Sequence, residues 1–278
     1  MRFTGIIGVL ALTGLIAGCS GKDTGDTTAT WSDTDTDTDT DTDPTGAVYF
    51  SVSGSSAYIA EGVPGNAGLC VHIIDPTNAV LGGKPEVLGT SVLAKDGTFT
   101  VENITTASTL GIMMMVQDCK VPKGGPTVFT TATGISVDDY SSVKDGTALS
   151  GYTAYIISND YATGIADSLA VAGSKLDIYA GGLIHGNVLD GKSMPIADAT
   201  ITCAACEVYY GDENPMDGLY TTTGVGANSA TSLAGAGLFV VPAAPITTYG
   251  VDHATETFGA LTLGALPSIA TVVAFVAE

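Results

Sequence analysis

The sequence predicts an all-β protein in which two β-sandwich domains follow one another behind a disordered N-terminal tether. Short runs rich in Val, Ile, Thr, Tyr and Phe begin at residue 47 and are separated by Gly, Pro, Asn and Asp. The chain has 36 glycines and only 14% charged residues, a composition that does not fit a coiled coil or a long helical bundle. The 232 residues from Ala47 to Glu278 suit two sandwiches better than one.

The first residues have the organisation of an export signal. Arg2 provides a short positive region, and the apolar run at residues 6–16 follows it. This run is too short to cross the ~30 Å hydrocarbon core of a bilayer as a permanent helix. We therefore expect residues 1–18 to be a signal peptide that is removed.

The run ends in the sequence I-A-G-C at residues 16–19, which resembles the bacterial lipobox. The resemblance implies cleavage before Cys19 and attachment of fatty acyl chains such as palmitate to that cysteine. Several acyl chains on one residue give a durable anchor, because each buried CH₂ contributes about 0.8 kcal/mol. Ser20 follows the cysteine where an aspartate would favour retention, so the resemblance implies the bacterial outer membrane or cell surface.

Residues 19–46 are predicted to be a disordered tether that begins at the lipidated cysteine. Asp and Thr alternate strictly from Asp33 to Asp43, and residues 20–46 hold eight aspartates against Lys22, a net charge of −7. Such a segment cannot bury enough apolar area to offset its ordering entropy, and its like charges repel. Calcium is the alternative ligand, but the repeat lacks the glycine turn and bidentate glutamate of a calcium loop.

The charge of the body argues against nucleic acid as a partner. The whole chain carries a net charge of −20, and the body from residue 47 onward carries −14 with seven lysines and no arginine. Binding of phosphate backbones requires clustered Lys and Arg. The body also lacks the guanidinium group that commonly binds carboxylate or phosphate.

Thirteen runs in the body are expected to form strands. In the first domain, at 47–158, they are 47–52, 69–74, 87–93, 98–101, 110–116 and 154–157. In the second domain, at 182–278, they are 183–189, 199–202, 207–210, 219–223, 238–241, 248–251 and 269–276.

One short helix is expected near the domain junction, within residues 159–181. Asn159 or Asp160 is predicted to cap it, Ile165 and Leu169 stand four residues apart on one face, and Gly173 is predicted to end it.

The two halves share a pattern of residues. D-G-T-F-T-V at 96–101 corresponds to A-G-L-F-V-V at 236–241, with a glycine for a tight turn and alternating Phe and Val for one sheet face. The second half also contains G-N-V-L-D at 186–190 and P-I-A-D-A-T-I at 195–201. These motifs mark turns and core positions, so they bear on fold rather than on function.

Together these motifs resemble the carboxypeptidase regulatory-like, or transthyretin-like, domain, over residues 182–278 and more weakly over 47–158. The resemblance implies a seven-stranded Greek-key sandwich in each half, usually without catalytic activity. Such domains are often part of surface, transport or carbohydrate-handling proteins. Two positions depart from the motif, since Asp198 replaces a glycine and Ala236 replaces an aspartate.

Four cysteines remain in the body, namely Cys70, Cys119, Cys203 and Cys206. Their even number in an exported protein predicts two disulfides, for which three connectivities are possible. Pairing within each half, Cys70 with Cys119 and Cys203 with Cys206, is the economical choice. The C-x-x-C spacing of the second pair also raises a redox hypothesis, but a reactive pair normally stands at a helix N-terminus.

Candidate ligand-binding residues gather in the second half. Tyr209, Tyr210 and Tyr220 could stack on sugar rings, and the carboxylates of Asp212, Glu213 and Asp217 could bind calcium. Buried strand tyrosines and a solvated loop are the competing interpretations. No other cofactor is indicated.

No catalytic set is visible in the sequence. His72, His185 and His253 lie in separate segments, and neither H-E-x-x-H nor G-x-S-x-G occurs. Met113, Met114 and Met115 are interpreted as core-filling residues. The sequence thus favours a non-enzymatic envelope lipoprotein that binds an envelope protein or serves as a structural module. A carbohydrate-binding surface module is the alternative, and a hydrolase or redox protein comes third.

Overall fold

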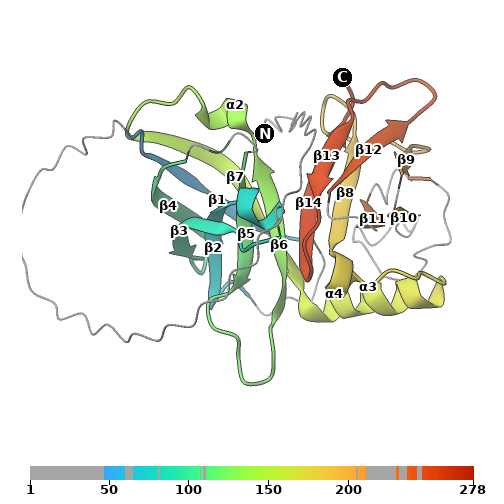
Figure 1. Ribbon diagram of the computed structural model, residues 1–278, viewed down its shortest axis with the longest axis horizontal. Coiled ribbons are helices and arrows are strands. Elements are labelled where there is room, and N and C mark those ends of the chain that lie inside the picture. The colour runs from blue at the N-terminus through green and yellow to red at the C-terminus, as the bar shows by residue number, and fades with distance from the viewer. Residues whose placement is uncertain are drawn as a thin grey trace, which may run out of the picture. The chain divides into compact units, whose positions relative to one another are not determined.

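The computed structural model confirms the all-β class (Figure 1). It describes residues 47–59, 65–80, 82–106, 108, 111–204, 206–210, 230–231, 237–242 and 246–278, with the backbone alone at 237–242. The export signal, Cys19, the acidic tether and the strand expected at 219–223 lie outside these residues.

The strands of the first half form two packed layers. One layer has the order β3-β2-β5-β6, and the other has the order β4-β1-β7, with β7 also pairing with β6 at one end. Two short helices, α1 and α2, lie in connections. The elements are β1 (Phe50–Tyr58), β2 (Leu69–Asp75), α1 (Thr77–Val80), β3 (Glu86–Val92), β4 (Thr98–Ile104), β5 (Ile112–Asp118), β6 (Val128–Ile135), α2 (Val137–Tyr140) and β7 (Thr147–Ser158).

The second half begins with two helices and continues with strands in two groups. One group has the order β10-β11-β8-β14, and the other has the order β13-β12-β9. The elements are α3 (Asn159–Val171), α4 (Ile178–Gly181), β8 (Leu183–Leu189), β9 (Thr200–Cys203), β10 (Cys206–Tyr210), β11 (Gly237–Pro242), β12 (Ile246–Asp252), β13 (Leu261–Gly264) and β14 (Ile269–Val276).

The two halves repeat one pattern of strand pairing. Within the described residues each half has seven strands. The first strand pairs antiparallel with the fourth and parallel with the seventh, as β1 does with β4 and β7, and as β8 does with β11 and β14. The second strand pairs with the fifth, and the fifth with the sixth, in both halves. This internal repeat is far clearer in the backbone than in the sequence.

The shared motif lies on the fourth strand of each half. In β4, Phe99 and Val101 are buried and their neighbours are exposed, as the alternation predicts. Gly97 has a φ of 84°, which is the left-handed conformation expected of the turn glycine. Asp198, which replaces a glycine of the resembled motif, has a φ of 60°. Aspartate is one of the few residues other than glycine that adopts this conformation readily.

The expected helix is present as α3, with a different cap. Ser158, rather than Asn159 or Asp160, is the N-cap, and its hydroxyl accepts a hydrogen bond from the backbone N–H of Tyr161 at 3.1 Å. Serine and asparagine are equally good N-caps, so residue type alone could not show whether the helix is capped at Ser158 or at Asn159. The helix ends at Val171 with Ala172 as its C-cap. Gly173, the predicted stop, follows this cap, and its φ of 89° suits the residue just beyond a helix C-terminus.

The two halves are joined by strand pairing as well as by the chain. β14, the last strand, pairs parallel with β8 on one side and with β6 of the first half on the other. A sheet therefore runs without interruption from β3 to β10 through both halves.

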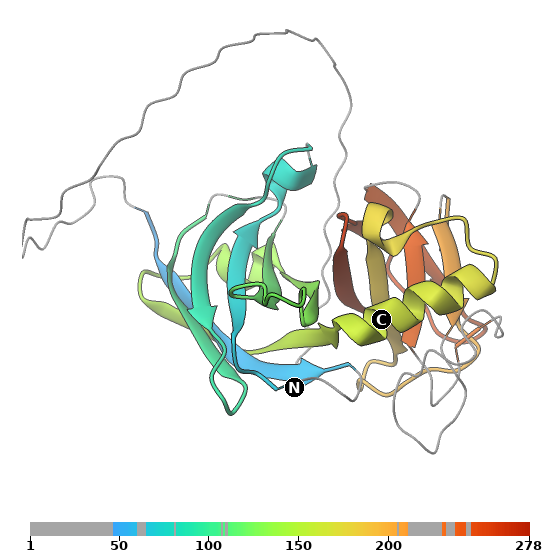
Figure 2. The ribbon, with the colours of Figure 1, turned by 90° about the horizontal axis from the view of Figure 1, so that it is seen from below.

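A hydrophobic cluster lies where the two halves meet. Its buried members come from both halves and from the helices between them: Ile59, Phe129, Ile157, Ala162, Ile165, Leu169, Ile178, Leu183, Ala270 and Val272. Figure 2 shows α3 leaving the end of β7 and running along the strands of the second half. We call this group the junction cluster.

Two strands and long parts of two others were missed by the sequence analysis. The strand expected at 47–52 begins at Phe50 and continues to Tyr58 as β1. β6 has the sequence V-F-T-T-A-T-G-I, in which threonines and small residues replace the large apolar residues that mark a strand. β13 is four residues long, too short to carry a clear period. β7 begins at Thr147 instead of residue 154, because its exposed first part lacks apolar alternation.

Replacing Ile165 with Ala should destabilise the body by roughly 2–4 kcal/mol, since a fully buried side chain in the junction cluster would leave a cavity. Val171→Ala on the same helix, where the side chain is 90% exposed, should change stability by no more than about 0.5 kcal/mol. Urea unfolding followed by circular dichroism measures both. Equal effects of the two substitutions would show that α3 does not pack as described.

Candidate functional site

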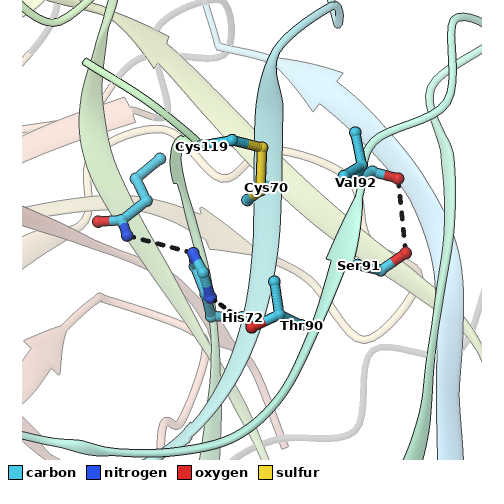
Figure 3. The surroundings of a disulfide bond; sticks show 7 residues. Cys70, His72, Thr90, Ser91, Val92 and Cys119 are labelled. Carbon is cyan, nitrogen blue, oxygen red and sulfur yellow. Dashed lines mark hydrogen bonds between the residues drawn. A yellow bond between two sulfur atoms is a disulfide. The ribbon is translucent and has the colours of Figure 1, made fainter. Parts of the chain in front are cut away.

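The structure pairs the four body cysteines within each half. Cys70 on β2 is bonded to Cys119, which directly follows β5, across a sequence separation of 49 residues (Figure 3). Cys203 at the end of β9 is bonded to Cys206 at the start of β10. This is the economical connectivity of the three that the sequence left open.

The Cys203–Cys206 disulfide joins two strands that belong to different sheets of the second half. Both cysteines pack against the hydrophobic core of that half. The adjacent Glu207 has its pKa lowered by hydrogen bonds from the Ser174 and Tyr209 hydroxyls, so it carries a negative charge. A negative neighbour disfavours a thiolate, and neither cysteine begins a helix. The surroundings therefore support a structural link more than redox chemistry.

The first disulfide borders a polar row that crosses three strands. On β2, the next residue on the face of Cys70 is His72, whose Nδ1 lies 2.7 Å from Thr90 Oγ1 of β3. Its Nε2 lies 3.1 Å from Gln117 Nε2 of β5. Figure 3 shows the His72–Thr90 contact beside the Cys70–Cys119 bond. We call Thr90, His72 and Gln117 the polar row.

The polar row places a hydroxyl, an imidazole and an amide in sequence, which is also the order of groups in a nucleophile activated by a base. The direction of its hydrogen bonds decides whether His72 acts as a base toward the Thr90 hydroxyl. The amide nitrogen of Gln117 donates to His72 Nε2, so Nδ1 carries the ring proton and donates to Thr90 Oγ1. A base would instead accept the proton of the hydroxyl. Partial burial lowers the pKa of His72, which keeps the ring neutral. The polar row is therefore a cross-strand link.

The three methionines beside this row divide between the two faces of β5. Met114 is buried in the core of the first half, as predicted for core filling. Met115 pairs in register with His72, and Met113 with Ile74, on the opposite face of the sheet. Met115 is also buried there.

The structure places two tyrosines of the predicted sugar platform, Tyr209 and Tyr210, on opposite sides of β10. Tyr210 is only 5% exposed, and its hydroxyl oxygen accepts a hydrogen bond from the Ile201 N–H at 2.8 Å. Tyr209 points to the other side of β10, packs against the junction cluster and donates to Glu207 at 2.7 Å. Tyr220 lies outside the described residues.

The proposed calcium ligands Asp212, Glu213 and Asp217 also lie outside the described residues. Among the residues that are described, no group of three or more His, Cys, Asp or Glu side chains is placed to hold a metal ion. Asp138 and Asp139 begin α2, where the Asp138 N–H donates to the Ser136 hydroxyl at 3.2 Å. Burial, together with the nearby Asp139 carboxylate, raises the pKa of Tyr152 to about 12.

Several other polar groups brace loops. Asp75 at the end of β2 accepts hydrogen bonds from the backbone and hydroxyl of Thr77 and from the Ser108 hydroxyl. Asp118 at the end of β5 accepts from the backbone and hydroxyl of Thr127, where the chain re-enters β6. A sequence signal was present in both cases, since an Asp at the end of a strand is a common loop-bracing residue.

The comparisons do not assign this chain to a group. No protein-family model matches it, and a search of curated proteins finds no match. No helix in the described part of the chain has the length and apolar character needed to span a membrane. The functional conclusion therefore rests on the residues and on the fold.

The two disulfides should differ in their contribution to stability. In the chain-entropy model, closing a loop of about 50 residues stabilises by roughly 4 kcal/mol, and closing one of about four residues by roughly 2 kcal/mol. Replacing Cys70 and Cys119 with Ala should therefore cost more than replacing Cys203 and Cys206. Non-reducing urea unfolding of both double variants measures this. A larger loss from the Cys203–Cys206 variant would contradict the ranking.

The buried His185 should make the body sensitive to acid. Burial lowers its pKa to about 4, whereas an unfolded histidine titrates near pH 6.5. Stability from this group is thus complete above about pH 6.5 and falls by roughly 3 kcal/mol as pH drops through about 4. Unfolding free energies across this range should lose that slope in His185→Gln and keep it in His253→Gln. An unchanged slope in the His185 variant would assign acid sensitivity elsewhere.

Proposed function

We propose that this protein is a non-enzymatic lipoprotein of the bacterial envelope, anchored through Cys19 at the outer membrane or cell surface. Its body acts as a structural or protein-interaction module built from two transthyretin-like sandwiches. The observation that carries this proposal is the continuous sheet through β6 and β14, which fuses two similar halves into one frame. A frame of this kind holds surface contacts in fixed positions.

The polar side chains and cysteines described above have structural contacts, which supports a module without catalysis. The polar row links strands, Asp75 and Asp118 brace loops, and the described cysteines are in disulfides. Disulfides that staple strands are typical of proteins that work outside the cytoplasm.

The edge strand β3 offers a surface for a protein partner. Within the described residues β3 pairs with β2 alone. Val87 and Val92 on this strand are 54% and 63% exposed, although their partners in register on β2, Ile74 and Cys70, are buried. Exposed apolar residues on an edge strand favour contact with another protein over contact with a sugar.

Replacing Cys19 with Ala should release the protein from the membrane fraction and change its neighbours. Proximity labelling in intact cells should recover envelope proteins with the native chain and lose them with the variant, because the body is no longer held at the surface. Retention of the Cys19 variant in washed membranes would contradict the anchor. Folding is checked by secretion of the variant with both disulfides formed.

The carbohydrate alternative is tested on a glycan array. Binding of the native protein that is lost in Tyr209→Ala would replace a protein partner with a sugar. Tyr209 is the residue to change, because Tyr210 is buried and its removal would damage the core. Glycan binding that survives unchanged in Tyr209→Ala would place the sugar elsewhere on the protein.

A further inference from the structure

The connection between β5 and β6 is an exposed loop of mixed chemistry. It has the sequence C-K-V-P-K-G-G-P at residues 119–126. Val121 is 65% exposed, and the Lys120 and Lys123 side chains on either side of it are also exposed. Figure 1 shows this connection, in green, projecting beyond the ends of β5 and β6. We call residues 119–126 the basic loop.

The basic loop is held firmly at its base. The disulfide to Cys70 fixes its first residue, and the Cys119 N–H donates to the Gly68 carbonyl at 2.8 Å. Across the loop, Asp118 accepts hydrogen bonds from Thr127, which ties the two strands together.

The tip of the loop is also fixed in shape. The Gly125 N–H donates to the Pro122 carbonyl at 3.0 Å, which closes a turn centred on Lys123 and Gly124. Prolines at 122 and 126 restrict the backbone further. Val121 is thus presented to solvent by a pre-organised loop, and little entropy is lost when it binds.

The charge of this loop is opposite to that of its surroundings. The body has a net charge of −14 and seven lysines, of which two stand three residues apart at this tip. The other five, at positions 84, 95, 144, 175 and 192, are separated from one another by at least ten residues. Two positive charges beside an exposed valine suit a partner whose surface layer is anionic and whose underlying layer is apolar.

We propose that the basic loop contacts the anionic headgroup surface of the membrane that holds the Cys19 lipid. Lys120 and Lys123 pair with headgroup phosphates, and the Val121 side chain enters the boundary between headgroups and acyl chains. This inference rests on the proposed lipid anchor. It adds a second, weaker contact that orients the body.

The length of the tether makes a weak contact sufficient. The tether that the sequence predicts at residues 19–46 would have a root-mean-square span of roughly 30 Å as a random coil, which would hold the body near the surface at an effective concentration of the order of millimolar. The remaining body and the tether are acidic and are repelled by an anionic surface. The basic loop is consequently the part of the described surface that such a membrane attracts.

A tryptophan at the tip reports the contact directly. Trp31, the single tryptophan of the chain, is first replaced with Phe to remove its fluorescence. Val121→Trp is then introduced in the full lipidated chain, which is reconstituted into vesicles. In vesicles that contain phosphatidylglycerol, the emission of this residue should shift to the blue and be quenched by brominated acyl chains. In phosphatidylcholine vesicles, or at high salt, both effects should be absent. Val171→Trp, at a valine on α3 that is still more exposed than Val121, should show neither.

The lysines are tested in the same reporter background. Lys120→Gln combined with Lys123→Gln should lower the ratio of membrane-bound to free loop about 25-fold, since each lysine near an anionic surface contributes about fivefold. Lys144→Gln combined with Lys192→Gln removes the same charge elsewhere and should leave the signal unchanged. Equal loss in both pairs, or no loss in either, would overturn the proposal.

The failure of the anchor is distinguishable from the failure of the loop. Flotation of the native chain with vesicles tests the anchor alone. The Cys19→Ala chain with the same reporter, titrated with phosphatidylglycerol vesicles, tests the loop alone, and a blue shift there supports it. A reporter that shifts with an acidic peptide such as poly-aspartate and with no vesicle would overturn the membrane contact and assign an acidic protein instead.

Discussion

The pairing of β14 with β6 is the interaction on which the rest of the structure depends. Without it, two sandwiches would be connected by a helical linker and would move independently, as domains joined by small interfaces do. With it, the last strand of one half extends the sheet of the other, and the junction cluster buries one face of α3, formed by Ala162, Ile165 and Leu169. The surface residues of both halves therefore belong to one body, and strands β3 and β10 lie at the two ends of its longest sheet.

The repeated pairing of first, fourth and seventh strands explains why so little of the sequence needs to be shared between halves. A parallel pairing of first with last strand sets the order of the layers, whatever side chains fill the core. The positions that do correspond, such as Gly97 and the buried Phe99 and Val101, are those where backbone conformation or sheet face restricts the choice. Asp198 shows that such a position can accept another residue, because it adopts a positive φ that glycine usually supplies.

The sequence predicted the class, the helix and most strands, because alternation, turn residues and caps are local signals. It did not predict that β6 pairs across the junction, since pairing between residues 130 and 269 leaves no mark on either segment. The disulfide pairing was predicted by joining cysteines within the same half of the chain. Tyr209 and Tyr210 do not share a face, since they are neighbours in a strand, where successive side chains point to opposite faces. The polar row was missed because three residues from three strands have no common sequence pattern.

The central place of β14 has a consequence for the order in which this chain can fold. Both β8 and β6 present unpaired edges until residues 269–276 arrive, although β6 begins about 140 residues earlier. Contacts of such long sequence separation form late, and exposed strand edges invite association with other chains meanwhile. In the exported protein that we propose, the chain would thus remain prone to association until translocation is nearly finished. Chaperone protection during transit matters more for this topology than for two sandwiches that each close by themselves.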